Sequence, residues 1–260
     1  MIGKAGDPVT SLSQAYPDRV EVRGRDLAGD LMGQVTFTEY FHLLLTGQEP
    51  TLEQRFFLDL VLVALAEHGL MPTNVAARMT LAAAPDALQG AVAAGILGAG
   101  TVVLGTPVAC AELLEGMQKE VATGREPAAV ASATAGEIHA AGGKVPGFGH
   151  PVHKPVDPRA ERIFELADKR GVSGSHIALA LALRQAVADT WGKPLTLNVS
   201  MAIAAVMLDL GFPSASVRAV PILARTASLL AHLAEEEENP LGFLLASKAE
   251  EAIVYRPPAE

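Results

Sequence analysis

The sequence consists largely of apolar segments with helical spacing, separated by Gly and Pro. Half of the 260 residues are hydrophobic but only 5% are aromatic, so helices rich in Ala, Leu and Val are the means of filling a large core. The expected helices cover residues 27–32, 37–45, 51–68, 74–84, 87–97, 106–122, 128–141, 160–170, 175–190, 197–210 and 214–238. Apolar and polar side chains alternate from residue 20, which is typical of a short strand or an extended arm over residues 20–25, and no block rich in strands occurs. The sequence therefore predicts an all-α protein, whose core we expect to include Met32, Met71, Met79, Met117 and Met201.

The charge balance argues against a nucleic-acid partner. There are 29 Asp and Glu residues against 20 Lys and Arg, which gives a formal net charge of -9. A net-acidic surface repels phosphate backbones, so an anionic ligand would have to be met by local arginines. Cys110 is the one cysteine and cannot form an intrachain disulfide, and no charged segment followed by an apolar stretch opens the sequence. We therefore expect a cytoplasmic protein.

Residues 87–111 carry no charged side chain and are long enough to span a bilayer. However, Gly and Pro interrupt the run, and no belt of Lys or Arg flanks it. Buried helices with a break between them are the favoured interpretation, and no membrane partner is expected.

The segment richest in chemically useful side chains is the loop at residues 144–159, KVPGFGHPVHKPVDPR. Its glycines allow a ligand to approach the backbone closely, and exposed amides there could cradle a phosphate or a thioester oxygen. The donors and cations along it, which suit an anionic ligand, are His150, His153, Lys154 and Arg159. Two alternatives are a metal site at the histidines and a loop that merely joins helices. No acidic or cysteine partner stands at metal-ligand spacing, so no metal is expected.

This loop resembles the citrate synthase superfamily, whose members carry Gly-Phe-Gly-His followed at fixed spacing by Lys and then by Asp-Pro-Arg. Other segments resemble family motifs in the same order along the chain. They are Arg23-Gly24-Arg25-Asp26, residues 43–51, Glu67-His68-Gly69-Leu70 with residues 76–78, residues 224–233, and Tyr255-Arg256-Pro257. The resemblance implies a citrate synthase-like fold. Its large helical domain would comprise residues 1–107 and 211–260, and its smaller inserted helical domain residues 108–210.

The resemblance also implies a ligand set. His68 and His150 would bind the keto or hydroxyl oxygen of an oxaloacetate-like group. Its carboxylates would be held by Arg159, Arg225 and Arg256, the last supplied by the partner subunit of a homodimer with a shared active site. Coenzyme A, as acyl-CoA substrate or product, would meet Lys154 and the backbone of Gly147, Phe148 and Gly149. Two alternatives stay open from the residues themselves: His68 as a helix C-cap and Arg225 as half of a surface ion pair.

Two positions depart from the synthase pattern. Leu104 stands where synthases carry a histidine that stabilises the enol of acetyl-CoA, and leucine cannot donate that hydrogen bond. Ser200 stands where they carry the aspartate that removes the methyl proton, and Asp209 is too far along a helix to substitute. The citryl-CoA lyase branch of the superfamily also lacks the histidine, and the short length of the chain likewise favours a resemblance to this branch.

The leading prediction is therefore a citryl-CoA lyase-like enzyme. It would cleave or form a carbon–carbon bond between an acetyl-CoA unit and an oxaloacetate-like keto acid. The alternatives are a citrate synthase-type transferase, or a catalytically silent homologue that binds CoA or a dicarboxylate and regulates a partner. A purely structural helical protein is the least favoured hypothesis.

Overall fold

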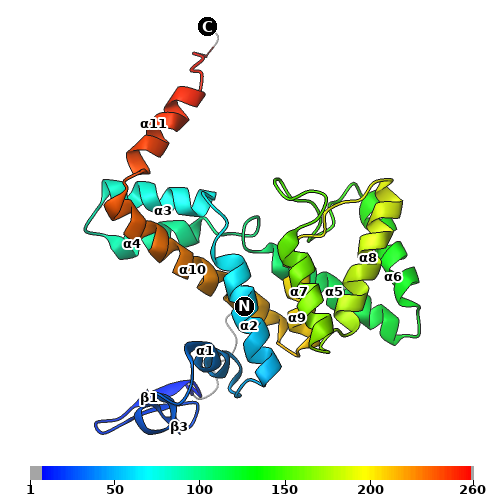
Figure 1. Ribbon diagram of the computed structural model, residues 1–260, viewed down its shortest axis with the longest axis horizontal. Coiled ribbons are helices and arrows are strands. Elements are labelled where there is room, and N and C mark those ends of the chain that lie inside the picture. The colour runs from blue at the N-terminus through cyan, green and yellow to red at the C-terminus, as the bar shows by residue number, and fades with distance from the viewer. Residues whose placement is uncertain (1–7, 259–260) are drawn as a thin grey trace. The chain divides into compact units, whose positions relative to one another are not determined.

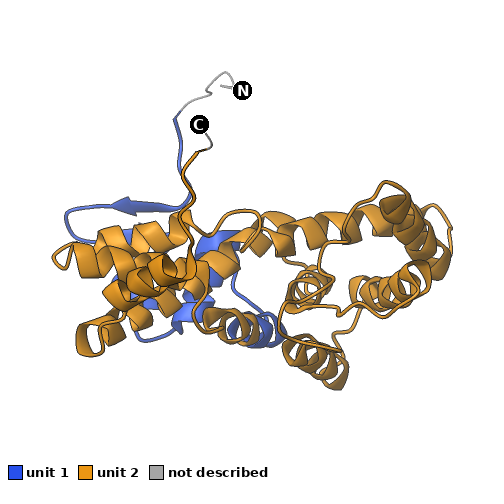
Figure 2. Ribbon diagram, turned by 90° about the horizontal axis from the view of Figure 1, so that it is seen from above, with its two compact units in different colours: residues 1–59 blue, residues 60–260 orange. Residues whose placement is uncertain are grey.

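The computed structural model describes residues 8–258, and the chain divides into two compact units, residues 1–59 and 60–260 (Figures 1 and 2). In the first unit, the alternating segment forms part of a small antiparallel sheet, ordered β1 (Ser13–Ala15), β2 (Val20–Val22) and β3 (Arg25–Asp26). A single π-helical turn, Leu27–Leu31, follows where a helix is expected. Helix α1 (Phe37–Thr46) comes next, and α2 (Leu52–Ala66) begins in this unit and ends in the second.

Local signals set the bounds of α1. Thr36 accepts a hydrogen bond from the Glu39 amide, and the Glu39 carboxylate accepts one from the Thr36 amide, which forms a capping box. Gly47, at φ 76°, ends the helix in the left-handed conformation that glycine adopts without strain.

The second unit is helical within the described residues, and the all-α prediction is confirmed. Its helices are α3 (Pro72–Ala83), α4 (Leu88–Leu97), α5 (Thr106–Ala122), α6 (Pro127–Ala140), α7 (Pro158–Lys169), α8 (Ser175–Trp191), α9 (Val199–Asp209), α10 (Ser214–Glu238) and α11 (Gly242–Ala252). Helices α3 to α10 begin and end within two residues of the expected positions, and α11 follows them. The division into domains 1–107 with 211–260 and 108–210 stays a prediction, and its outermost residues, 1–7 and 259–260, lie outside the described residues.

Helices α9 and α10 organise this unit. Every residue of α9 from Met201 to Met207 is buried, and the helix packs against α5, α7 and α8. Helix α10 contacts α5 and α9 as well as α3 and α4, where Leu229 and Leu233 pack into a core with Ala77 (Figure 1). The prediction of core methionines is wrong for Met32 and Met79, which are exposed, because both lie on outward-facing positions.

The apolar run at residues 87–111 is divided between α4 and the start of α5. By length and composition, one described helix could cross a membrane, namely α10. A buried core helix passes the same test, and α10 buries ten residues against its neighbours.

A buried arginine joins α3 to α10. Arg78 is 1% exposed and donates to His232 Nδ1 at 3.1 Å and to Glu236 Oε2 at 2.9 Å, and it also pairs with Glu235. The other oxygen of Glu236 accepts the amides of Leu241 and Gly242, so the same carboxylate fixes the start of α11. Although burial opposes ionisation, these donors hold the pKa of Glu236 below its ordinary value.

Replacing this cation tests how much the network stabilises the fold. In Arg78→Met the Glu236 carboxylate stays buried without its cation, so we expect a loss of about 3–5 kcal/mol in the free energy of unfolding. Urea denaturation measures it. Arg125→Met, which removes an exposed ion pair with Glu120, is the control and should change little. Equal losses in the two variants would contradict the role assigned to the network.

Candidate functional site

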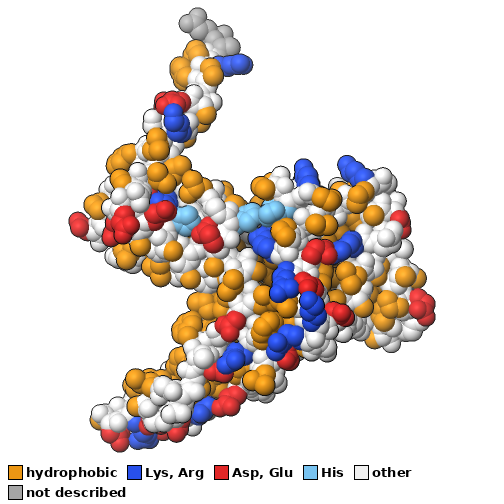
Figure 3. Space-filling model, in the orientation of Figure 1, with side chains coloured by type: hydrophobic (Ala, Val, Ile, Leu, Met, Phe, Trp, Pro, Cys, Tyr) orange, Lys and Arg blue, Asp and Glu red, His pale blue; other side chains and the backbone are white. Residues whose placement is uncertain are grey.

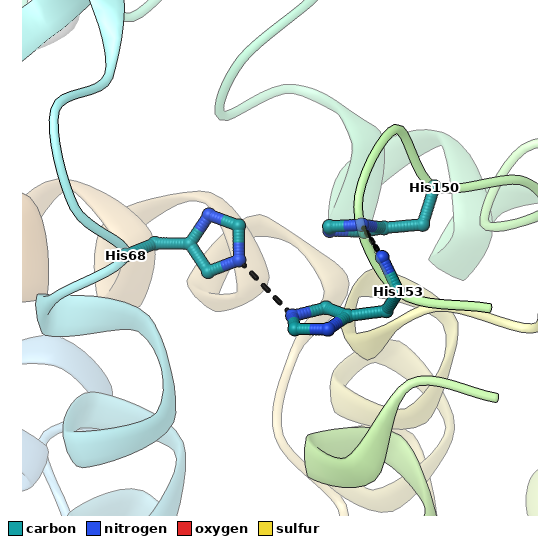
Figure 4. Close-up of side chains that lie close together, drawn as sticks. All are labelled: His68, His150 and His153. Carbon is teal, nitrogen blue, oxygen red and sulfur yellow. Dashed lines mark hydrogen bonds between the residues drawn. The ribbon is translucent and has the colours of Figure 1, made fainter.

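Three histidines meet in the second unit (Figure 4). His68 lies between α2 and α3, whereas His150 and His153 lie in the loop between α6 and α7. The Nε2 atoms of His68 and His153 are 3.2 Å apart. The rings of His150 and His153 stack with centroids 4.4 Å apart, and His68 meets each of them edge-on at 5.3 Å. The structure thus brings His68 and His150, to which the resemblance assigns a ligand, together with His153 of the same loop.

Glu67 fixes the backbone that carries His68. Its Oε1 accepts the amides of His68 and Gly69, both at 2.7 Å, and its Oε2 accepts the Ser228 hydroxyl of α10 at 2.9 Å. Burial opposes ionisation of Glu67, yet these donors and nearby His232 hold its pKa below the ordinary value. The His68 ring is turned toward His153, and none of its contacts within the described residues caps α2.

The glycine loop is anchored to the start of α9. The Asn198 amide donates to Gly147 O at 2.8 Å, and its side chain donates to Gly149 O at 2.9 Å. The Gly149 amide donates to Thr196 O at 2.7 Å, and the Phe148 amide donates to Val145 O. The amides of Phe148 and Gly149 are therefore engaged within the protein, unlike the exposed amides that the sequence suggests.

Backbone amides determine the tautomer of His150. Its Nδ1 lies 3.1 Å from the Val152 amide and 2.8 Å from the His153 amide. Because both amides are donors, Nδ1 presents its lone pair and the neutral ring carries its proton on Nε2. That Nε2 lies 3.4 Å from Nη2 of Arg159, which is also a donor. Two donors thus converge with no acceptor between them, which suits an oxygen-rich anion.

Asp157 orients Arg159. This fully buried carboxylate caps α7 and accepts Nε of Arg159 at 3.0 Å and Nη2 at 2.9 Å. It also accepts the Val199 amide at 2.9 Å, which ties α7 to α9. Burial opposes ionisation, but these donors hold the pKa of Asp157 below its ordinary value. The pairing fixes one edge of the Arg159 side chain, which is 20% exposed, and no hydrogen bond of its Nη1 is found among the described residues.

Arg225 of α10 is a buried cation. It is 5% exposed, so the alternative of a surface ion pair is wrong. Its Nη1 donates to Asn74 Oδ1 at 3.3 Å, and its Nε has no hydrogen-bond partner within the described part of the chain. Burial lowers its pKa, although nearby Glu67 opposes this. A buried cation with unfilled donors favours binding of an anion.

Four further residues were singled out from the sequence, namely Lys154, Arg256, Leu104 and Ser200. Lys154 and Arg256 are exposed, and Arg256 follows α11. Leu104 is buried and lines a cavity of about 300 Å³ with Arg218 and Ile222 of α10. The amide of half-buried Ser200 donates to Asn198 Oδ1, the cap of α9.

Burial and the neighbouring cations lower the pKa values of two of the histidines, His68 and His150. Burial lowers the pKa of His68, with further contributions from Arg159, His153 and Arg225, while Asp157 opposes them. Burial and His153 lower the pKa of His150 in the same way. On the surface in Figure 3, the pale-blue histidine side chains lie next to Lys and Arg side chains.

The histidine cluster has the spacing of a metal site, with one ligand atom from each ring within 4.8 Å of the others. His150 fits that role poorly, because backbone amides occupy its Nδ1 and the Arg159 guanidinium faces its Nε2. The donor set suits an anion better than a cation.

Three residues that orient this site were not predicted as site residues: Glu67, Asp157 and Asn74. His153 was named among the donors of the glycine loop, but no role was assigned to it. The sequence offered a signal for Asp157, which directly precedes the Pro that opens α7. The contacts of Glu67 and Asn74 with α10 depend on tertiary packing.

A pair of glycine substitutions tests how tightly the loop is packed. Gly147 and Gly149 both have positive φ, 78° and 88°, so alanine strains the backbone by about 1–2 kcal/mol at either position. At Gly147 an added Cβ would also lie 2.7 Å from Cys110 Sγ, whereas at Gly149 it would meet nothing within 4 Å. We expect Gly147→Ala to lose about 1–3 kcal/mol more than Gly149→Ala in urea denaturation. Similar losses would show that the contact with Cys110 is easily relieved.

The lowered histidine pKa values predict a pH dependence of stability. A histidine whose pKa is lower in the folded state stabilises the fold fully above its unfolded value of about 6.5. That stability is lost as the pH falls, because the unfolded chain then binds protons more readily. We expect the free energy of unfolding to fall between about pH 7 and pH 5, and less steeply in His68→Gln/His150→Gln. Denaturation at a series of pH values measures both slopes, and equal slopes would contradict the assignment.

Solved structures with a similar fold include a citryl-CoA lyase and an ATP citrate lyase. The citryl-CoA lyase of Hydrogenobacter thermophilus matches with a TM-score of 0.83 and 28% identity, covering 98% of this chain and 97% of that chain. The ATP citrate lyase of Methanothrix soehngenii, solved in complex with citrate and coenzyme A, matches with a TM-score of 0.80. It covers 100% of this chain and 43% of that chain, and at 22% identity it shows a shared fold alone.

Sequence comparisons find relatives among the citrate synthases. The citrate synthase of Heyndrickxia coagulans is 30% identical over 211 residues, which are 79% of this chain and 53% of that protein. The chain thus spans about half the length of the curated relatives it matches. The family model described as "Citrate synthase, C-terminal domain" matches residues 15–243. The resemblance and the citrate synthase-like fold predicted from the sequence are confirmed, and the chain belongs to the citrate synthase family.

Proposed function

We propose that this protein is a citryl-CoA lyase, which cleaves citryl-CoA into acetyl-CoA and oxaloacetate. The observation that carries the proposal is a set of donors around the histidine cluster, namely Nε2–H of His150 beside Arg159, and the buried Arg225, whose Nε has no partner in the described part of the chain. Both arginines act electrostatically on His68. The match over nearly the full length of a solved citryl-CoA lyase supports it.

Each donor has a chemical role in this reaction. The Nε2–H of His150 donates to the tertiary hydroxyl oxygen of the substrate and then to the keto oxygen of the product, where charge develops. Arg159, held by Asp157, and Arg225, held by Asn74, bind carboxylates of the acid with charge-assisted hydrogen bonds. His68, on its Glu67-bound backbone, faces the same space and exchanges the proton of the hydroxyl group.

Coenzyme A is proposed as part of the substrate and product, and a relative solved with citrate and coenzyme A supports this. Lys154 and the loop at Gly147, Phe148 and Gly149 would meet it, with contacts other than the engaged amides. A homodimer in which Arg256 enters the partner's site, and a cytoplasmic location, belong to the same proposal.

A second candidate is a catalytically silent binder of a dicarboxylate or CoA thioester. Ser200 in place of the usual carboxylate favours it, because the anion donors are retained while the expected base is absent.

A coupled assay separates the two functions. Purified protein is mixed with citryl-CoA and oxaloacetate release is followed, beside calorimetric titration with CoA, acetyl-CoA and oxaloacetate. Release at a rate proportional to enzyme supports the lyase. Binding without turnover contradicts it and supports the silent binder. Oxaloacetate condensing with acetyl-CoA, with no cleavage of citryl-CoA, would indicate a synthase-type transferase instead.

Arg225 predicts opposite effects on stability and binding. In Arg225→Met an incompletely paired buried cation is replaced by an apolar chain, so the free energy of unfolding should stay unchanged or rise by about 1–4 kcal/mol. Oxaloacetate binding should weaken by about 1.5–3 kcal/mol, because a charge-assisted contact is lost. Calorimetry and urea denaturation measure the two quantities. The control is Arg162→Met, which removes an exposed pair with Glu165 and should leave binding unchanged.

If Arg225→Met instead unfolds the protein, Arg225 is structural, and the anion site proposed around it is wrong.

A further inference from the structure

The proposed lyase reaction requires two proton movements, and the site lacks the usual group for them. The hydroxyl of citryl-CoA must lose a proton before the carbon–carbon bond breaks, and the carbon released must gain one to become the acetyl methyl group. A carboxylate at position 200 would be the expected acid–base group, but this chain has Ser200, which is a poor base.

The carboxylates around the site are already engaged. Asp157 accepts two side-chain nitrogens and the backbone amide of Arg159 as well as the Val199 amide. Glu67 accepts two backbone amides and a hydroxyl on its two oxygens. Asp209, at the far end of α9, accepts the amides of Gly174, His176 and Ile177. These donors stabilise the ionised forms, so none of the three carboxylates is positioned to exchange a proton with substrate.

The imidazoles are the remaining candidates for the acid–base group, and one of them, His150, cannot accept a proton. Two backbone amides occupy the Nδ1 lone pair of His150, so its ring is fixed as a donor. His68 and His153 are different, because each has a ring nitrogen that contacts only the other histidine. No hydrogen bond to Nδ1 of either ring is found in the part of the chain that the structure describes.

We propose that His68 and His153 act as one proton-sharing pair that replaces the missing carboxylate. His68 is the residue that meets substrate, and His153 is its positioning partner. At 3.2 Å the two Nε2 atoms form a hydrogen bond only if one carries a proton and the other a lone pair, so the two rings hold complementary tautomers (Figure 4). The inference rests on the proposed lyase function.

The proton transfers balance without any other reactant. At the start His68 carries its proton on Nε2 and donates to Nε2 of His153, which leaves Nδ1 of His68 as a base. The hydroxyl O–H bond breaks and its proton moves to Nδ1 of His68, while the Nε2 proton of His68 passes to His153, which becomes the cation. The carbon–carbon bond then breaks, and its electron pair forms the enolate of acetyl-CoA as the keto group forms.

The return transfer completes the reaction. Nδ1 of His68 gives its proton to the enolate carbon, which forms the methyl C–H bond, and His153 returns its proton to Nε2 of His68. The products are oxaloacetate and acetyl-CoA, and the pair ends with the protons it had at the start. His153 thus removes positive charge from a ring whose protonation Arg159 and Arg225 disfavour.

The test variant is His153→Gln, whose amide can keep a hydrogen bond to His68 but cannot accept a proton. We expect kcat for citryl-CoA cleavage to fall by about 100- to 10,000-fold while KM and the affinity for oxaloacetate change less than about threefold. Added imidazole should restore part of the rate in His153→Ala. The control is His139→Gln in α6, whose ring packs edge-on against Trp191, and it should keep the wild-type rate.

A second readout does not depend on turnover. In an NMR titration the pKa of His68 should rise in His153→Gln, because one of the neighbours that lowers it is gone. The other charged or titratable groups around His68, namely His150, Arg159, Asp157 and Arg225, stay in place.

The outcomes separate the two proposals. An active wild type with an equally active His153→Gln overturns the pair, and so does a variant that loses binding as much as rate. If the wild type does not cleave citryl-CoA, the lyase proposal fails. The titration then decides whether the pair exists, since an unchanged pKa of His68 in His153→Gln would overturn it.

Discussion

The buried carboxylate of Asp157 is the interaction on which the rest of the site depends. It caps α7, holds two nitrogens of Arg159 and accepts the first amide of α9, so one side chain connects the loop to two helices. A fully buried charge is tolerated only when its hydrogen-bonding capacity is filled, and here four donors fill it. The direction of the Arg159 guanidinium therefore follows from the fold and not from the ligand, and such preorganisation is what binding an anion requires.

The cations of the site are supported in different ways. Arg159 is paired with a carboxylate before any ligand arrives, whereas the hydrogen bond found for Arg225 among the described residues is to the amide oxygen of Asn74. Arg78, in the same unit, contacts two carboxylates and an imidazole. Arg78 therefore stabilises the fold, whereas the incomplete pairing of Arg225 lowers stability. Such a cost in stability is typical of a functional site.

Most of the fold could be predicted from the sequence, because the periodicity of apolar residues and the Gly and Pro breaks between them are local signals. Helices α5 and α10 begin and end where those signals place them. The π-helical turn at residues 27–31 was missed because spacing alone does not distinguish it from a short α-helix. For the site, motifs pointed to His68, His150, Arg159 and Arg225, whose place in the site stays a prediction. The contacts of Glu67 with Ser228 and of Asn74 with Arg225 join distant segments. The occupied loop amides could not be foreseen either, because their acceptors depend on tertiary structure.

The packing of Gly147 against Cys110 has a further consequence. Cys110 is fully buried, burial raises the pKa of its thiol, and the backbone at Gly147 leaves no room for even a methyl group beside the sulfur. A thiol reagent can reach this sulfur only after a segment packed around it, such as the glycine loop, has moved away. As the chain has one cysteine, the rate of its alkylation under native conditions reports how often the packing beneath the glycine loop opens. The chain therefore contains its own probe of local opening at this place, and no label need be introduced.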